Sequence, residues 1–137
     1  MRLQYWTPIV FLAPERYVAE GDHFAEVPLR AWSEAGYTYD PDPWQGWNDF
    51  LTPPEEMLSM NAEGDCEDYA FLAASVLASR GVSPIDIVFL TAEDGVGGHV
   101  LCATEARVFS SGDVFNRPLR EWLPETRWTL PIRRRVR

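Results

Sequence analysis

The sequence contains no lysine: all twelve basic residues are arginine, and 21 acidic residues give a formal net charge of −9. This acidity argues against nucleic acid as a partner, because a surface that binds phosphates has to be basic. Acidity without lysine has two explanations, a GC-rich coding bias or adaptation to high salt. The second would place the protein in a halophilic archaeon or in the virion of one of its viruses.

Long apolar runs are also absent. No stretch approaches the roughly 18 uninterrupted apolar residues of a membrane span. Residues 1–8 show no basic region followed by an apolar core, so no secretion signal is predicted. We therefore expect no membrane partner and a cytoplasmic or virion-associated location. Only two cysteines are present, Cys66 and Cys102, and a disulfide between them is disfavoured because Cys102 lies in an apolar strand.

The length of 137 residues and the 46% hydrophobic content predict one globular domain spanning residues 1–137. Pro8 interrupts the apolar residues near the amino end, which favours an edge strand or an extended N-terminal arm over residues 1–22. Arginines dominate residues 131–137, and this basic tail is either solvated or docked on an acidic neighbour.

The clearest local pattern predicts a helix over residues 66–80. Asp65 is a good N-cap, acidic residues fill the first turn, and Gly81 ends the helix. Its broad apolar stripe indicates a central helix packed on a sheet. Cys66 therefore opens this helix, where the dipole and the unpaired backbone N–H groups favour the thiolate, although the neighbouring carboxylates oppose it.

The other expected elements are shorter. Strands are predicted over residues 85–90, 99–103, 107–111 and 127–130, and short helices over 28–35, 52–60 and 117–123. His99 opens the second of these strands. Because side chains alternate along a strand, His99 shares a face with Leu101 and Ala103, whereas Cys102 points to the other face and is expected to be core packing.

Two motifs carry a family resemblance. The run Gly-Asp-Cys-Glu-Asp-Tyr-Ala at residues 64–70 resembles the active-site signature of the bacterial transglutaminase-like cysteine proteinases, and residues 50–58 resemble the segment before it. Gly98-His99-Val100 matches the histidine motif of that family. The resemblance spans roughly residues 25–125. It implies an α+β, papain-like fold in which a central helix packs on a small antiparallel sheet, with Cys66 as nucleophile and His99 as base.

The same resemblance implies that an aspartate on the next strand orients the histidine. Counting along the hairpin from His99 puts Ser110 nearest to that place, with Asp113 three residues further on. We predict Asp113 as the third catalytic residue, since a carboxylate stabilises an imidazolium better than a hydroxyl does. The expected substrate is a protein or peptide, no cofactor is needed, and the acyl group passes either to water or to an amine.

Several alternatives stay open. Asp65, Glu67 and Asp68 either stabilise the helix start or hold a cation such as calcium; no zinc-ligand spacing is present, and no metal is predicted. The aromatic loop at residues 37–47 either packs on the domain or lines a substrate cleft. A second class of function is a structural or assembly protein that contacts partners through this loop or through the arginine tail at residues 131–137.

Overall fold

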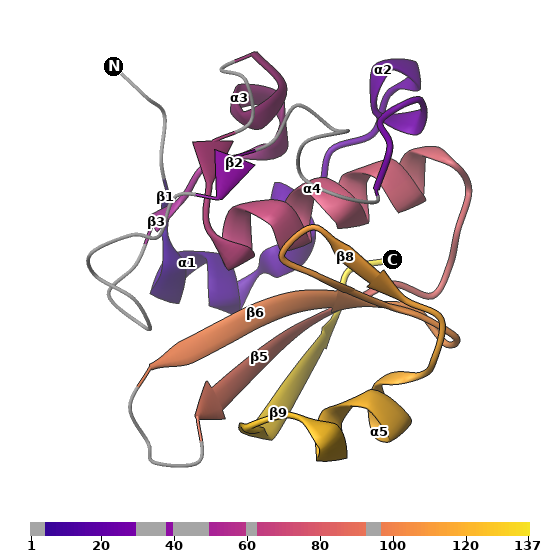
Figure 1. Cartoon of the computed structure of the whole chain (residues 1–137). Helices are drawn as coiled ribbons and strands as arrows, with labels where there is room; N and C mark the ends of the chain where they lie inside the picture. Colours follow the sequence, from indigo (N-terminus) through magenta and orange to yellow (C-terminus); the bar gives the residue numbers. More distant parts are fainter. Residues whose placement is uncertain (1–4, 30–37, 40–49, 60–62, 93–96) are drawn as a thin grey trace.

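The computed structural model describes residues 5–29, 38–39, 50–59, 63–92 and 97–137. Its largest sheet has five antiparallel strands in the order β8-β7-β6-β5-β9. The helix α4 (Cys66–Ser79) lies across this sheet, and α2 (Asp22–Ala25) and α3 (Pro54–Ser59) pack on the other side of α4 (Figure 1). The five strands are β5 (Asp86–Ala92), β6 (Gly98–Ala103), β7 (Val108–Ser110), β8 (Asp113–Phe115) and β9 (Trp128–Arg135).

Two small sheets and several short helices complete the domain. β1 (Tyr5–Trp6) pairs antiparallel with β3 (Phe50–Leu51), and β2 (Thr38–Tyr39) pairs parallel with β4 (Glu63–Gly64). The remaining helices are α1 (Thr7–Leu12), η1 (Pro14–Tyr17), α2 (Asp22–Ala25), α3 (Pro54–Ser59), α5 (Leu119–Trp122) and η2 (Leu123–Glu125). The predicted α+β architecture, with a central helix on a small antiparallel sheet, is confirmed.

The central helix α4 (Cys66–Ser79) begins where its capping residues predict. Asp65 accepts hydrogen bonds from the backbone N–H groups of Glu67 and Asp68, and the Asp68 carboxylate accepts one from the backbone N–H of Asp65. These reciprocal bonds form a capping box, which satisfies otherwise unpaired donors at the helix start. Every residue from Glu67 to Ala78 is buried, as expected for a helix enclosed on all sides.

The sheet carries a different cluster of apolar side chains on each face. Ile87, Cys102 and Phe109 belong to the cluster that includes α4. Their strand neighbours Val88 and Leu101 belong to a second cluster, completed by residues of α5 and by Trp128. Since successive side chains on a strand alternate, α4 covers one face of the sheet and α5 covers the opposite face.

The amino-terminal segment differs from the extended arm that Pro8 suggested. Tyr5 and Trp6 form the short strand β1, and the chain then forms α1 and the 3-10 helix η1. Pro8 is the second residue of α1, a position where its missing N–H has no helical partner to lose. Phe11 of α1 packs edge-to-face on Phe89 of β5, with ring centroids 4.9 Å apart.

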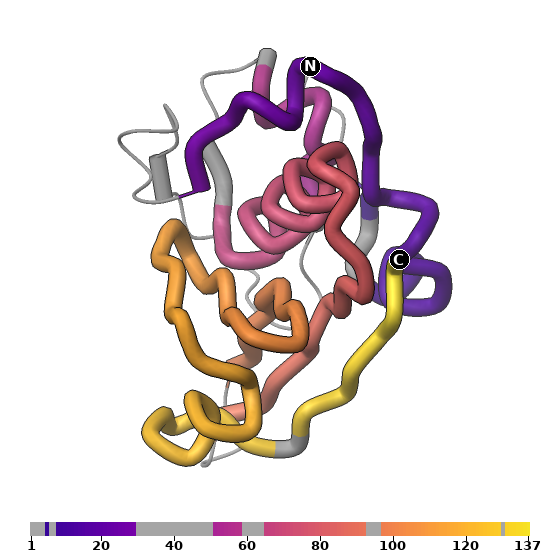
Figure 2. Tube along the Cα trace, turned by 90° about the vertical axis from the view of Figure 1, so that its right-hand side faces the viewer, coloured from indigo at the N-terminus to yellow at the C-terminus, as the bar shows by residue number. Residues whose placement is uncertain are grey.

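The arginine-rich end is an edge strand and not a solvated tail. β9 continues the predicted strand through Arg135 and pairs with β5. Arg133 and Arg135 both bind the buried carboxylate of Asp86, so the positive charges are compensated within the sheet. Arg134 donates to the carbonyl of Leu12, which joins this strand to the amino-terminal segment, as the yellow and indigo traces show in Figure 2.

The predicted helix over residues 28–35 and the aromatic loop over residues 37–47 lie mostly outside the described residues. Of the loop, the structure describes only the strand β2. Within the described part of the chain, no helix has the length and apolar character needed to cross a membrane.

Candidate active site

Cys66 is the first residue of α4 and is partly exposed, whereas Cys102 on β6 is fully buried; the two cysteines do not form a disulfide. The chain around Cys66 is fixed by Asp68. Its carboxylate accepts the backbone N–H of Thr52 at 2.6 Å and that of Asp65 at 3.0 Å. The capping box therefore holds the residue before Cys66 and also ties the segment ahead of α3 to the helix start.

Asp65 and Asp68 use their side-chain oxygens to accept these internal backbone hydrogen bonds. Asp65, Glu67 and Asp68 are all buried. Burial, together with the nearby Asp65 charge, raises the pKa of Asp68 well above its usual value, against the two backbone hydrogen bonds. No group of three potential metal ligands occurs in the described parts of the chain. The contacts of Asp65 and Asp68 thus favour the helix-start interpretation of the cluster.

His99 is held by two contacts on β6. Its Nε2 lies 2.7 Å from Oγ of Ser110. Its ring stacks on Trp128, with centroids 4.9 Å apart and an interplanar angle of 15°. Burial, and secondarily the positive charge of Arg127, lowers the pKa of His99 from 6.5 to about 4. At neutral pH the imidazole is therefore uncharged in this structure.

The face on which His99 lies follows from the register of the sheet. His99 pairs with Leu90 and shares its face with Leu101, in agreement with the predicted alternation. Trp128 contacts the same apolar cluster. This is the face covered by α5, opposite the face covered by α4. Cys66 and His99 both lie near the beginnings of their elements, which run in the same general direction (Figure 1). The register of the sheet places His99 on the face of β6 that α4 does not cover.

Ser110 and Asp113 flank the tight turn between β7 and β8. They are cross-strand partners, and the two residues between them, Ser111 and Gly112, have φ of 48° and 88°. Ser110 is buried and contacts His99, whereas Asp113 is exposed. Among the residues that the structure describes, Ser110 and not Asp113 reaches the imidazole. The role of Asp113 as the orienting residue stays a prediction.

Sequence reasoning missed two residues of this region. Trp128 covers the imidazole of His99, and its only sequence signal is an aromatic residue opening an arginine-rich strand. Thr52 supplies the backbone N–H that Asp68 accepts, and it is fully buried. The sequence predicted Asp65 as the N-cap and Asp68 as part of the acidic first turn, but a bond across 16 residues has no local signature.

A cysteine that opens a buried helix, with a histidine on an antiparallel strand of the sheet below it, defines the papain-like class of fold. The chain belongs to the transglutaminase-like domain family, whose model matches residues 25–109. No curated protein matches the chain. These comparisons confirm the family that residues 64–70 and 98–100 resembled.

Two solved structures are similar to the chain, both of LapG from Legionella pneumophila. The first is 17% identical, with a TM-score of 0.53, and covers 81% of this chain and 68% of LapG. The second, calcium-bound LapG, is 16% identical with a TM-score of 0.50, and covers 90% of this chain and 63% of LapG. At this level of identity the likeness shows the fold, and it supports the predicted α+β, papain-like architecture.

Proposed function

We propose that the chain is a cysteine peptidase or amidohydrolase of the transglutaminase-like class, acting on a protein or peptide. The observation that carries this proposal is the partly exposed thiol of Cys66 at the first position of a long, capped helix. The helix dipole and the unpaired backbone N–H groups at this position favour a thiolate and stabilise negative charge that develops on a substrate carbonyl. Cys66 then acts as the nucleophile.

In the proposed reaction His99 accepts the proton of the Cys66 thiol, the thiolate attacks a carbonyl carbon and forms a thioester, and His99 returns this proton to the amine that leaves. Water or a second amine then releases the acyl group. Because Nε2 of His99 contacts Ser110, Nδ1 is the nitrogen left for the thiol. His99 lies against Trp128 on the α5 side of the sheet, so the proposal requires the imidazole to leave this stack before it meets Cys66.

A second candidate is a domain that keeps the fold for assembly and has weak or no catalysis. The position of His99 favours it: the ring is stacked and hydrogen-bonded on the sheet face opposite α4, and its low pKa keeps it uncharged. A packed, uncharged histidine can stabilise the fold without acting as a base for a thiol. In this case residues such as Trp128 are part of a structural core, and contacts with other proteins carry the function.

Acylation of the thiol distinguishes the two candidates. On incubation with p-nitrophenyl acetate at pH 7, the peptidase proposal predicts an acetyl group on Cys66, found by peptide mass spectrometry, at least about tenfold faster than on Cys102. Cys102 is a control within the same molecule, because burial raises the pKa of its thiol and the side chain is inaccessible. An unchanged rate of Cys66 acetylation in His99→Gln, which lacks the base, would support the assembly candidate and refute the peptidase, because partial exposure alone makes Cys66 react faster than Cys102.

The third catalytic residue is tested by single substitutions. We expect Ser110→Ala to slow acetylation of Cys66 by about tenfold, because the imidazole loses the hydrogen bond that fixes its orientation. Asp113→Ala is the matched variant at an exposed position on the same hairpin, and a rate within about twofold of the unsubstituted chain would leave the orienting role with Ser110. The opposite pattern would assign the orienting role to Asp113, as the family resemblance implies.

A further inference from the structure

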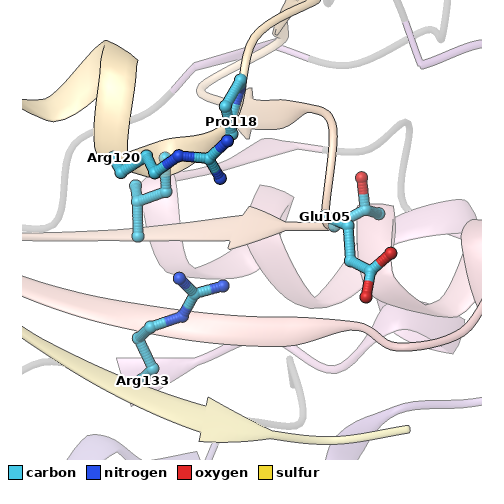
Figure 3. A pocket seen from close by; sticks show the side chains of 6 residues that line it. Glu105, Pro118, Arg120 and Arg133 are labelled. Atoms are coloured by element: carbon cyan, nitrogen blue, oxygen red, sulfur yellow. The ribbon is translucent and has the colours of Figure 1, made fainter.

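A pocket of about 390 Å³ lies on the α5 side of the sheet. It is lined by the end of β6 and its following turn, by the start of α5, and by β9: Thr104, Glu105, Pro118, Leu119, Arg120 and Arg133. Figure 3 shows the side chains of Arg120 and Arg133 directed toward the same space, with Glu105 further along it. The pocket shares no residue with Cys66, His99 or Ser110, so the inference below does not depend on the proposed function.

Arg133 is held in a fixed position. Its Nε and Nη2 donate to the same carboxylate oxygen of Asp86, at 3.1 and 2.7 Å. The other oxygen accepts from Arg135 at 2.6 Å. Burial alone would raise the pKa of Asp86, but the hydrogen bonds from Arg135 and Arg133 outweigh it and lower this pKa. The ionised carboxylate therefore anchors one guanidinium at the pocket wall.

Arg120 faces this anchored group from α5 (Figure 3). In the described part of the chain its guanidinium has no hydrogen-bond or ion-pair partner, although Arg117 three residues earlier is paired with Glu125. Two guanidinium groups that face one pocket repel each other unless an anion lies between them. The protein has a net charge of −9, so these two arginines form a local positive region on an acidic protein.

The charge in the vicinity of the pocket is positive. Arg120, Arg133 and Arg135 bring three positive charges, and Asp86 and Glu105 bring two negative charges. Guanidinium groups present planar pairs of N–H donors that match the oxygens of carboxylates and phosphates. Pro118 and Leu119 add an apolar wall. Small-ligand sites combine an apolar lining with a few charged groups in this manner.

We propose that this pocket binds a small ligand through an oxyanion, a carboxylate or a phosphate, held between Arg120 and Arg133. The apolar part of the ligand lies against Pro118 and Leu119. Glu105 accepts a hydrogen bond from a hydroxyl or ammonium group at the other end of the pocket.

The test is a titration of the full chain at constant ionic strength, followed by two-dimensional NMR, with inorganic phosphate and N-acetylglutamate as separate probes. We expect saturable shifts in residues 104–105 and 118–120. Arg120→Gln is expected to weaken binding by about tenfold or more, because a hydrogen bond to a charged group is lost. Arg107→Gln, which removes one positive charge from an exposed residue of the turn after β6 that does not itself line the pocket, is the matched control and should leave binding unchanged.

Saturation by phosphate alone would identify a phosphorylated ligand, and saturation by N-acetylglutamate alone would identify a carboxylate ligand; either supports the site. If neither probe saturates, the proposal is wrong. It is also wrong if Arg107→Gln weakens binding as much as Arg120→Gln does, since the effect would then be general charge attraction. Both substitutions are at exposed positions, so the folded domain should persist in each variant.

Discussion

Lowering the pH from 7 to 4 is expected to reduce the free energy of unfolding by about 3 kcal/mol through His99. In the folded domain its pKa is about 4, because the ring is buried and lies near Arg127, against an ordinary value of 6.5. Between these values the unfolded chain takes up a proton that the folded domain does not. The stabilising contribution is complete above about pH 6.5, and it is lost as the pH falls to about 4.

Urea unfolding at several pH values, followed by tryptophan fluorescence, measures this loss. The matched variant is His99→Gln, whose side chain can still hydrogen-bond Ser110 and has no charge at any pH. The difference in unfolding free energy between the unsubstituted chain and His99→Gln is expected to change by about 3 kcal/mol between pH 7 and pH 4. Parallel curves would show that His99 has an ordinary pKa and lies in a more open site than the structure describes.

The second large effect is expected from Asp68→Ala, which should lower the free energy of unfolding by about 3 kcal/mol. The substitution removes the acceptor of two backbone N–H groups, those of Thr52 and Asp65, at a buried position. Each buried donor left without a partner costs about 1–3 kcal/mol. The capping box of α4 is lost at the same time.

The sign of the pH dependence gives a further check on Asp68. Its pKa is raised, first by burial and then by Asp65, so the folded domain holds a proton that the unfolded chain releases. The contribution of Asp68 to stability is therefore greatest in acid and declines as the pH rises through the folded value. Asp68→Ala should destabilise the domain more at pH 4, near the ordinary pKa of the carboxyl, than at pH 8, and Asp68→Asn, which keeps one carbonyl acceptor, should destabilise it less. Glu15→Ala, at an exposed position, is the control with little effect; a loss below 1 kcal/mol for Asp68→Ala at both pH values would contradict the bonding described.

The central elements could be predicted because their signals are local. Asp65 and the acidic first turn define the start of α4, Gly81 defines its end, and a β-branched apolar run defines β5. The alternation of β6 also placed Cys102 in the core and His99 on the other face. The alternation of side chains did not predict which face of the sheet α4 would cover, because that depends on how whole helices and strands pack.

The parts that sequence reasoning missed depend on distant contacts or on rare backbone conformations. The turn before β8 requires a left-handed conformation at Ser111, which a serine seldom adopts, so Gly112 and Asp113 read as the end of a strand and not as a hairpin. The arginines of β9 read as a tail that is either solvated or docked on an acidic neighbour, because the acid that compensates them, Asp86, lies 47 and 49 residues away from Arg133 and Arg135.

The late position of β9 has a consequence for how the domain folds. β5 and its partner β6 are close in the sequence, so they can pair early. The second partner of β5 is β9, the last strand of the chain, and their paired residues Asp86 and Arg135 are separated by 49 residues. We therefore expect β9 to join the sheet last. Until then β5 has one unpaired edge and apolar side chains on both faces. Such an edge can pair with a second chain, so aggregation of partly folded molecules is expected to begin at β5.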